Sequence, residues 1–190
     1  MTRDFDTDKL TSGYLELYLA RVDRPRRILE VGVQSGGSLL LWCDVWPDVE
    51  RVVGVDLQLP EGLRHPKVDL FQADQADTEE LDRIARQTGP FDLIIDDASH
   101  VGVSSWSTFR ALWPHVRDDG IYAVEDWGTG YWAHWPDGED YAPGPPPGHT
   151  AGMVGLIKRL VDELDNGSGS RLELLPGLAF LYREGATPAA

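Results

Sequence analysis

Residues 28–38 read Ile-Leu-Glu-Val-Gly-Val-Gln-Ser-Gly-Gly-Ser, and this stretch decides the fold. Its apolar start predicts a buried strand, and the apolar side chains at helical spacing beyond Ser38 predict a helix. Between them, Gly32, Gly36 and Gly37 allow a ligand to approach the backbone, and the start of a helix offers unpaired N–H groups. Their spacing differs from the GxGxxG of dinucleotide-binding proteins. We therefore expect a ligand-binding turn, with a tight strand-to-helix connection as the alternative.

Strand-like apolar runs recur along the chain at intervals that leave room for helices. This pattern is typical of an α/β protein whose mostly parallel sheet carries helices on both faces. Two runs near the C-terminus, separated by Pro176-Gly177, predict a closing antiparallel hairpin, so we expect seven strands. The predicted strands are residues 28–31, 51–55, 68–71, 91–95, 121–124, 171–175 and 178–182, and the predicted helices include residues 39–46, 81–85, 109–116 and 150–164.

The composition narrows the class of protein. The 190 residues, which we take as a single domain over residues 1–190, contain 17 Lys and Arg against 32 Asp and Glu, a net charge of −15. This charge argues against nucleic acid and against an anionic membrane, because binding to either needs basic side chains. The single cysteine, Cys43, excludes an intrachain disulfide, and residues 1–6 contain no apolar signal segment. We expect a cytoplasmic protein.

Acidic residues follow the second and third predicted strands. Asp56 ends the second strand about twenty residues beyond the glycines, where an acid in nucleotide-binding sheets hydrogen-bonds ribose hydroxyls. Asp74, just after the third strand, is placed to contact an adenine amino group. For the neighbouring Asp77, a role as the N-cap of the next helix is as good an explanation as a cofactor contact, or a better one. The turn and these acids together predict a cofactor that contains adenosine.

Two acidic pairs follow the fourth and fifth predicted strands. Asp96 and Asp97 come after a very apolar run, and Glu125 and Asp126 end the next one. Because the carboxyl ends of parallel strands meet at one edge of the sheet, the four acids should converge beside the glycine-rich turn. Adjacent carboxylates on a buried strand are costly unless they are solvated, paired or bound to a cation. The alternative, a helix cap at Asp96 or Asp97, leaves the second pair unexplained.

The donor types at this edge favour a hard cation. Carboxylates without cysteine suit Mg²⁺, which keeps waters that a substrate can displace. His100 lies three residues past Asp97, and a histidine, which titrates near neutral pH, is the natural general base. The alternative for His100 is a surface position outside the site.

Residues 127–149 interrupt the regular pattern. They are rich in glycine, proline and aromatic residues, and the run from Pro143 to Gly148 cannot enter a helix or a central strand. A loop of this length in a compact domain is usually a functional lid or disordered, and its Trp and Tyr side chains favour order. As a lid it would exclude water and stack on a flat or glycosylated ring. The alternative is a proline-rich surface excursion.

These motifs resemble those of the class I S-adenosylmethionine-dependent methyltransferases. More narrowly, they resemble the metal-dependent sugar O-methyltransferases of macrolide tailoring, the mycinamicin and macrocin type. That branch shows an Asp-Asp-Gly-Ser-His motif, then a Glu-Asp pair with a downstream Tyr-Trp. Here these stand as residues 96–100, 125–126 and 131–132, and residues 7–14 resemble the family's Thr-Asp-Lys segment. The similarity extends from about residue 6 to residue 164.

The resemblance implies a Rossmann-like fold and a role for each motif. Residues 1–26 would form an N-terminal segment leading into the sheet, and residues 127–149 would form the lid. The catalytic base would be His100, the Mg²⁺ ligands Asp97, Glu125 and Asp126, and the substrate-facing residues Trp127, Tyr131 and Trp132. S-adenosylmethionine would be held by Glu30, Gly32, Ser35, Gly36, Gly37, Ser38, Asp56, Leu57, Asp74, Gln75 and Asp96.

Two departures from the family pattern matter. Ala98 stands where the family has glycine, a small change that stiffens the turn. The macrolide enzymes also carry a further N-terminal region that helps to form the sugar pocket and the oligomer, and residues 1–190 do not include it. We therefore do not expect the identity of the substrate to transfer.

The expected function is Mg²⁺-dependent O-methylation of a small-molecule hydroxyl in natural product or antibiotic biosynthesis, with a sugar hydroxyl of a glycosylated metabolite as the first choice. A cephalosporin hydroxylase-like protein and a non-catalytic cofactor-binding partner are alternatives, although no two-histidine, one-carboxylate iron set is evident. An NAD-dependent enzyme is disfavoured by the glycine spacing. Seven tryptophans are compatible with a homo-oligomer, because aromatic side chains are enriched in interfaces.

Overall fold

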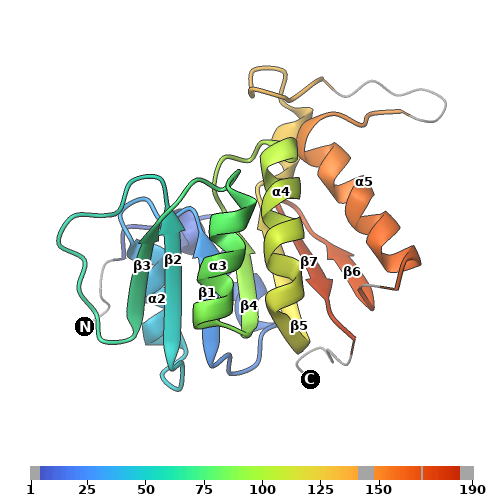
Figure 1. The fold of residues 1–190 in the computed structure, drawn as a ribbon. Helices are drawn as coiled ribbons and strands as arrows, with labels where there is room; N and C mark the ends of the chain where they lie inside the picture. Colours follow the sequence, from blue (N-terminus) through green and yellow to red (C-terminus); the bar gives the residue numbers. More distant parts are fainter. Residues whose placement is uncertain (1–4, 141–147, 168, 185–190) are drawn as a thin grey trace.

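The computed structural model describes residues 5–140, 148–167 and 169–184. Within these ranges the chain forms a seven-stranded sheet in the order β3-β2-β1-β4-β5-β7-β6 (Figure 1). Strands β1 to β5 are parallel, and β7 pairs antiparallel with β5 and β6, which confirms the predicted sheet and its closing hairpin. The strands are β1 Arg27–Val31, β2 Arg51–Asp56, β3 Val68–Gln72, β4 Phe91–Asp96, β5 Val116–Glu125, β6 Arg171–Leu174 and β7 Leu178–Tyr182.

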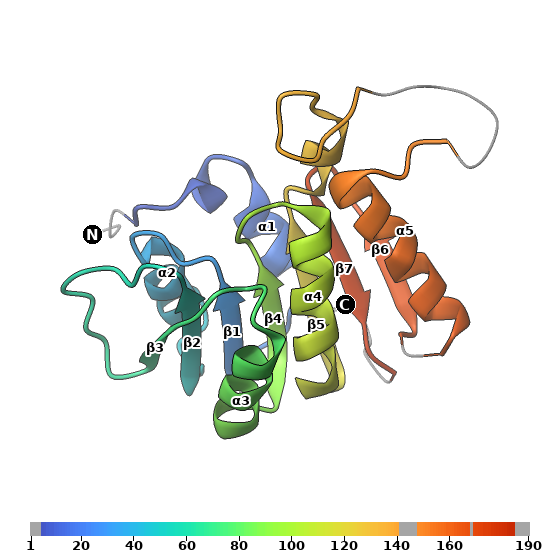
Figure 2. The same cartoon turned by 45° about the horizontal axis from the view of Figure 1, so that its top comes forward.

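Helices cover both faces of the sheet. Helices α1 and α2 lie on one face, and α3, α4 and α5 lie side by side on the other (Figures 1 and 2). None of the helices within the described ranges is long and apolar enough to cross a membrane. The α-helices are α1 Tyr14–Leu19, α2 Gly37–Val45, α3 Thr78–Thr88, α4 Gly102–Leu112 and α5 Gly152–Asp165, and the short 3₁₀ helices are η1 Asp8–Leu10, η2 Trp113–His115 and η3 Trp127–Tyr131.

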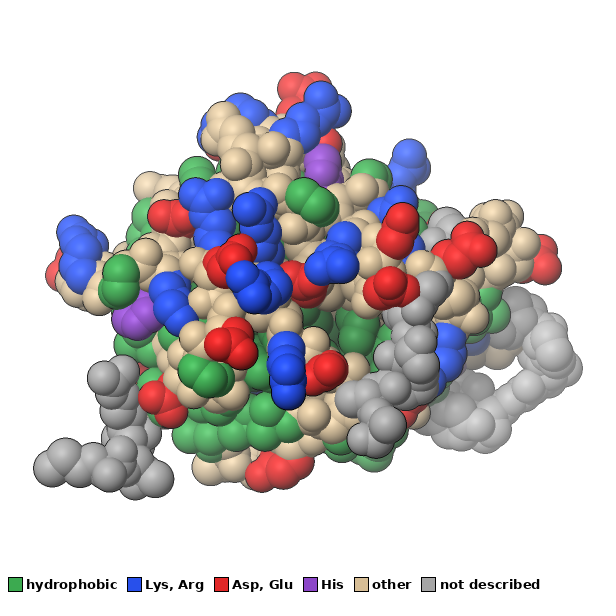
Figure 3. All heavy atoms as spheres, turned by 90° about the horizontal axis from the view of Figure 1, so that it is seen from below, with side chains coloured by type: hydrophobic (Ala, Val, Ile, Leu, Met, Phe, Trp, Pro, Cys, Tyr) green, Lys and Arg blue, Asp and Glu red, His purple; other side chains and the backbone are tan. Residues whose placement is uncertain are grey.

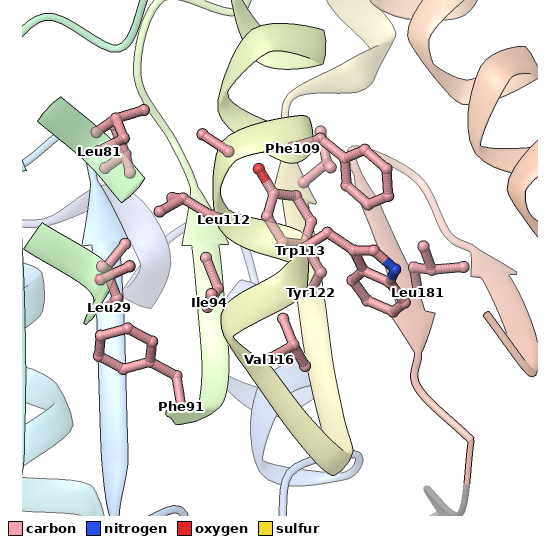
Figure 4. Close-up of a cluster of buried hydrophobic side chains, with 14 of the residues drawn as sticks. Leu29, Leu81, Phe91, Ile94, Phe109, Leu112, Trp113, Val116, Tyr122 and Leu181 are labelled. Carbon is pink, nitrogen blue, oxygen red and sulfur yellow. The ribbon is translucent and has the colours of Figure 1, made fainter. Parts of the chain in front are cut away.

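Alternate side chains of the strands supply an apolar core on each face. In β1, Leu29 packs toward α3 to α5 and Ile28 toward α1 and α2, because neighbouring residues of a strand point to opposite faces. Figure 4 shows the first core, in which Phe109 of α4 meets Tyr122 of β5 edge to face, with ring centroids 5.2 Å apart. Packing on both sides fixes the central strands β1 and β4, from which the candidate site extends.

The ends of α3 and α4 follow from local sequence. Asp77 is the N-cap of α3 and accepts the backbone N–H of Glu80 at 3.0 Å, as the sequence indicated. The prediction of a helix through residue 116 was wrong at its end: α4 stops at Leu112, and Val116 is the first residue of β5. Pro114 explains the difference, because proline lacks the N–H that would continue the helical hydrogen bonds.

The direction of strand order reverses between β1 and β4. In α/β sheets of this kind, ligands bind in the crevice outside the carboxyl ends of the strands at such a reversal. The glycine-rich turn leaves β1 at this point, Asp97 follows β4, and Asp126 follows the neighbouring strand β5. Residues 141–147, a part of the predicted lid, lie outside the described residues.

Candidate active site

The glycine-rich turn passes very close to the end of β4. Gly32 has φ +95°, and a Cβ atom at this position would lie 2.0 Å from the carbonyl oxygen of Asp97. Any side chain would therefore push the two strand ends apart. The turn and the first acidic pair are held in contact by the absence of a side chain at Gly32.

The N-terminal segment lies across the other half of the turn. A Cβ atom at Gly37 would lie 2.0 Å from the carbonyl oxygen of Asp6, and the Ser35 hydroxyl donates a hydrogen bond to that same oxygen at 3.1 Å. Ser35 and Gly37, which were predicted to bind the cofactor, thus contact the N-terminal segment in this structure. Gly36, with φ +83°, is the N-cap residue of α2 and lies beside Leu63.

A cavity of about 400 Å³, which we call the larger cavity, opens between the ends of β1, β2, β3 and β4. Its volume is within the range of small-molecule sites. The predicted cofactor residues that line it are Gly32, Asp56, Leu57, Asp74 and Gln75. Lining residues that were not predicted as cofactor contacts are Val31, Gln34, Val55, Ala73, Asp97, Ala98, Ser99, Val101 and Ser104.

Asp56 fixes the shape of this cavity. Its Oδ2 atom accepts the backbone N–H groups of Val33 at 2.6 Å and Gln34 at 3.0 Å, and its Oδ1 atom accepts that of Gln58 at 3.0 Å. An ionised carboxylate has about four acceptor positions, so these bonds leave room for a ligand hydroxyl. Asp56 therefore shapes the glycine-rich turn and is still able to bind a ribose.

The floor of the larger cavity is organised by Gln75. Its side-chain oxygen accepts the N–H of Ser99 at 3.0 Å, and its amide nitrogen donates to the Thr108 hydroxyl at 3.2 Å. Asp74 accepts the N–H of Ala76 at 2.8 Å and keeps its side chain at the cavity wall. Gln75 thus ties the end of β3 to the segment after β4.

A second cavity of about 270 Å³, the acidic cavity, adjoins the first. The two share Gly32, Gln34 and Asp97, so ligands in the two cavities would contact the same three residues. The acidic cavity is lined by Asp6, Thr7, Asp8, Lys9, Gly32, Val33, Gln34, Ser38, Asp97, His100 and Asp126. Ser38, a predicted cofactor residue, therefore faces the acidic cavity and not the larger one.

Asp97, His100 and Asp126 form a cluster at the end of the acidic cavity. His100 Nε2 lies 3.8 Å from Asp97 Oδ1 and 3.6 Å from Asp126 Oδ2, and one ligand atom from each residue falls within 4.8 Å of the other two. Carboxylate oxygens are the ligand atoms that a hard divalent cation prefers. The strand ends have thus brought Asp97, His100 and Asp126 together, as the sequence predicted for these three.

The backbone at this cluster is unusual. His100 and Asp126 have φ values of +50° and +52°, in the left-handed region that non-glycine residues rarely adopt. Each such residue costs roughly 1–3 kcal/mol and persists only where the surroundings hold it there, often at a functional site. Burial lowers the pKa of His100, and the nearby Lys9 ammonium lowers it further, against the opposing effect of Asp126. A neutral imidazole is the form that accepts a proton.

Glu125 and Glu30 lie behind the cluster, around the ammonium group of Lys9. Lys9 is 1% exposed, and its Nζ atom lies 2.6 Å from Asp97 Oδ2, 3.0 Å from Glu125 and 3.3 Å from Glu30. Tyr18 donates a hydrogen bond to Glu125 Oε1 at 2.7 Å. Both oxygens of Glu125 thus have partners in the interior, so the structure does not place this predicted metal ligand in the cluster with Asp97 and Asp126.

One ammonium among three carboxylates, of which Glu30 and Glu125 are buried and Asp97 is partly buried, leaves an excess of negative charge. Burial raises the pKa of Glu125 to about 7, although Lys9 acts to lower it, and burial with the neighbouring Glu125 holds the pKa of Asp97 well above its usual range. Glu30 accepts a hydrogen bond from Trp42 Nε1 at 2.7 Å and does not reach the larger cavity. Its place in the structure is as a partner of Lys9 and Trp42.

Asp96 is buried beneath the site. Its side chain is 1% exposed and lines neither cavity, and Tyr122 donates a long hydrogen bond of 3.5 Å to its Oδ2 atom. Burial raises the pKa of Asp96 to about 6. The structure thus separates the adjacent aspartates, with Asp97 at the cavities and Asp96 in the interior.

The aromatic residues of the predicted lid make different contacts in the structure. Trp127 donates its indole N–H to the carbonyl of Leu175 at 2.9 Å, and Trp132 is 47% exposed beside His134. Tyr131 packs near His149, with ring centroids 4.9 Å apart. Two described residues of the predicted lid contact the backbone of His100: Trp135 donates to the His100 carbonyl at 2.8 Å, and the Thr129 hydroxyl donates to the same oxygen at 3.4 Å.

Sequence reasoning did not identify the contributions of Lys9, Tyr14, Tyr18 and Trp135. Tyr14 donates a hydrogen bond of 2.6 Å to Asp126 Oδ1, so the N-terminal segment contacts both halves of the acidic cluster. A partial signal was present, because Tyr14 and Tyr18 are four residues apart and lie on the same face of a helix. Lys9 stands in the Thr-Asp-Lys segment, and no pattern in the sequence indicates that this segment lies beside Asp97.

This fold and site define the chain as a member of the methyltransferase-domain family, whose sequence pattern matches residues 29–127, just over half of the chain. It is similar to the mycinamicin VI 2''-O-methyltransferase of Micromonospora griseorubida, with 37% identity over 147 residues that make up 74% of this chain and 35% of that protein. It is also similar to the 8-demethyl-8-(2-methoxy-alpha-L-rhamnosyl)-tetracenomycin-C 3'-O-methyltransferase of Streptomyces olivaceus, with 37% identity over 157 residues, 78% of this chain and 39% of that protein.

The fold matches that of a solved relative. The MycE methyltransferase from the mycinamycin biosynthetic pathway, in complex with Mg, SAH and mycinamycin VI, aligns with a TM-score of 0.77 and 31% identity over 95% of this chain and 52% of that chain. The predicted Rossmann-like methyltransferase fold is confirmed. The chain spans well under half the length of the two curated relatives described here.

Proposed function

We propose that this chain transfers a methyl group from S-adenosylmethionine to a hydroxyl of a small-molecule secondary metabolite, with the help of Mg²⁺. The observation that supports this most directly is the junction of the two cavities at Gly32 and Asp97. One cavity has the lining of a nucleoside site, and the other ends in two carboxylates and a histidine. A cofactor and an acceptor would therefore meet at this junction.

The larger cavity fits S-adenosylmethionine. Asp56 lies at the end of β2 with acceptor capacity for ribose hydroxyls, and Asp74 lies at the end of β3 for the adenine. Gly32 brings the backbone of the turn against the place where the methionine portion would lie. Bound there, S-adenosylmethionine supplies an electrophilic methyl group on a sulfonium centre.

The acidic cavity fits a divalent cation held by oxygen atoms. Asp97 Oδ1 and Asp126 Oδ2 both face His100, and oxygen is the ligand atom that Mg²⁺ prefers. We assign the cation to these two carboxylates. Glu125 would become a third ligand only if one of its oxygens left Lys9 or Tyr18 and bound the ion. Mg²⁺ supplies a Lewis acid that makes an acceptor hydroxyl more acidic.

His100 is the proposed general base. Its Nε2 atom faces the space between Asp97 and Asp126, and its lowered pKa keeps the imidazole neutral before the reaction. As the methyl group arrives, His100 would accept the proton of the hydroxyl, and the imidazolium would be stabilised by Asp126. In well-oriented systems, alignment of two reactants supplies roughly 7–11 kcal/mol of the rate enhancement. The two cavities would provide such an alignment for the cofactor and the acceptor.

A sugar hydroxyl is the proposed acceptor. The relatives include a mycinamicin VI 2''-O-methyltransferase and a rhamnosyl-tetracenomycin-C O-methyltransferase. A sugar offers hydroxyl oxygens, which a cation held by Asp97 and Asp126 would make more acidic, and the aromatic residues of the predicted lid would offer apolar faces for a glycosylated ring. The hydroxylase and non-catalytic alternatives have less support, because these relatives are O-methyltransferases and Asp97, His100 and Asp126 lie together as O-methylation would require.

The test is methyl transfer from labelled S-adenosylmethionine to mycinamicin VI and to rhamnosyl tetracenomycin C, with Mg²⁺ and with EDTA. We expect a methylated sugar with Mg²⁺ and none with EDTA or with the variant Asp97→Ala. Calorimetric titration with S-adenosylhomocysteine is a separate check of the larger cavity. If neither S-adenosylmethionine nor S-adenosylhomocysteine binds, the proposed function is wrong.

A further inference from the structure

Each carboxylate of the cluster is held from behind by a donor of the N-terminal segment. Lys9 Nζ lies 2.6 Å from Asp97 Oδ2, and the Tyr14 hydroxyl lies 2.6 Å from Asp126 Oδ1. The second oxygen of each group, Asp97 Oδ1 and Asp126 Oδ2, faces His100 at 3.8 Å and 3.6 Å. The same arrangement therefore occurs twice: one oxygen is bound to the N-terminal segment and the other is turned to the cavity.

We propose that Lys9 and Tyr14 are positioning residues that orient Asp97 and Asp126 for a divalent cation. The inference rests on the proposed function and adds that the cation site is complete only when residues 9–14 are docked against β4 and β5. Neither residue is assigned a contact with the cation or the acceptor. Each acts through the carboxylate that it binds.

The physical reason is the freedom of an aspartate side chain. The terminal torsion of Asp is broad, so a carboxylate without a fixed partner rotates and presents its oxygens to the cavity only part of the time. A short hydrogen bond to one oxygen fixes the direction of the other. Partners of this kind around metal ligands typically contribute about 10–100-fold in metal affinity.

Both donors are themselves fixed. The Lys9 ammonium has three N–H donors, and three carboxylates surround it, those of Glu30, Asp97 and Glu125. The Tyr14 hydroxyl fits against Gly177 in the β6–β7 hairpin, where a Cβ atom would lie 1.9 Å from the hydroxyl oxygen. Neither donor can follow a rotating carboxylate, and this is what a positioning residue requires.

Tyr14→Phe is the decisive variant, because it removes one hydroxyl and changes no charge. Mn²⁺ serves as the probe for the Mg²⁺ site, and binding to the full chain is followed by the loss of the free-ion electron paramagnetic resonance signal. We expect Tyr14→Phe to bind Mn²⁺ about 10–100-fold more weakly than the wild type. Its affinity for S-adenosylhomocysteine and its unfolding midpoint should stay close to those of the wild type, which a merely structural role of Tyr14 would not allow.

Tyr182→Phe is the matched control. It also removes a tyrosine hydroxyl bound to a carboxylate, that of Glu173 at 3.2 Å, but outside both cavities. This variant should bind Mn²⁺ as the wild type does. Lys9→Met tests the second donor, and if it does not fold, Tyr14→Phe still decides the question.

Two results would overturn the inference, and they are distinguishable from failure of the proposed function. Wild-type affinity for Mn²⁺ in Tyr14→Phe means that the hydroxyl does not position Asp126. Stronger Mn²⁺ binding in folded Lys9→Met means that Lys9 competes with the cation and does not support its site. If the wild type itself binds no Mn²⁺, the metal dependence of the proposed function is wrong as well.

Discussion

The two edges of the sheet use acidic residues in opposite ways. At the amino edge, viewed in Figure 3, Lys and Arg side chains are interspersed with Asp and Glu. Arg51 pairs with Asp69 at 2.6 Å, with both side chains partly exposed, and Arg26 pairs with Glu50, with both side chains exposed. At the carboxyl edge, Glu30, Asp97 and Glu125 share the ammonium group of Lys9.

The pKa values follow the same division. At the amino edge, a hydrogen bond from Arg26 lowers the pKa of Glu50. At the carboxyl edge, burial raises the pKa of Glu125 to about 7. Exposed pairs contribute little to stability, whereas carboxylates crowded in the interior are costly and are found where function uses them. Of the acidic residues behind the net charge of −15, only those at the carboxyl edge therefore point to a functional site.

The largest expected effect is on catalysis at the carboxyl edge. His100→Asn removes the proposed base and keeps a residue that tolerates a left-handed backbone. We expect kcat for methyl transfer to fall about 10²–10⁴-fold, the usual contribution of a general base. Binding of S-adenosylhomocysteine is the control and should not change. A rate close to that of the wild type would remove His100 from the mechanism.

The next effect is on stability and contrasts the two edges directly. Lys9→Met leaves the buried carboxylates of Glu30 and Glu125, and the partly buried one of Asp97, without their cation and should lower the free energy of unfolding by about 3–5 kcal/mol. Arg51→Met breaks a partly exposed pair at the surface and should cost less than about 1 kcal/mol. Urea unfolding monitored by circular dichroism measures both. Equal losses in the two variants would contradict the division between the edges.

A third prediction concerns pH. Burial raises the pKa of Asp96 to about 6, above its unfolded value of roughly 3.9, so the folded state binds the proton more tightly. The stability from this group is present at low pH and is lost as the pH rises through about 6. Wild type should therefore lose about 3 kcal/mol relative to Asp96→Asn between pH 4 and pH 8.

Urea unfolding of both proteins across this pH range measures the difference. At the amino edge, the pKa of Glu50 is lowered by Arg26, so the sign is reversed: stability from that pair is present above the unfolded pKa and is lost as the pH falls. Glu50→Gln is therefore the matched comparison. The same sign for Asp96 and Glu50 would show that burial does not govern Asp96.

The smallest effect is expected at the lid. Trp135→Phe removes the hydrogen bond to the His100 carbonyl, which is worth about 0.5–1.5 kcal/mol. If this bond holds the backbone of His100 in place, methyl transfer should slow by about 2–10-fold, as that energy implies. Trp106→Phe, at a tryptophan stacked on Phe109 in α4, is the control and should leave the rate unchanged. Identical rates in all three proteins would mean that Trp135 does not support His100.

The local sequence was sufficient to predict most of the fold and about half of the site. Runs such as residues 91–95 are too apolar for any place but a buried strand, and strand direction brings Asp97 and Asp126 to one edge. The contacts of Lys9 and Tyr14 could not be predicted, because they join residues 88 and 112 positions apart in the chain. Alternation along the strand separates the side chains of Asp96 and Asp97, but the sequence does not show which of the two is buried, here Asp96 beside Tyr122.

The left-handed backbone at residues 100 and 126 has a consequence for the comparison of related chains. Only glycine, asparagine, aspartate and histidine adopt this conformation with any frequency, so the backbone alone restricts what can replace His100 and Asp126. Invariance at either position would therefore have two sources, conformation and chemistry. A natural homologue with asparagine at residue 100 would separate them, because it would keep the shape of the site and lose the base.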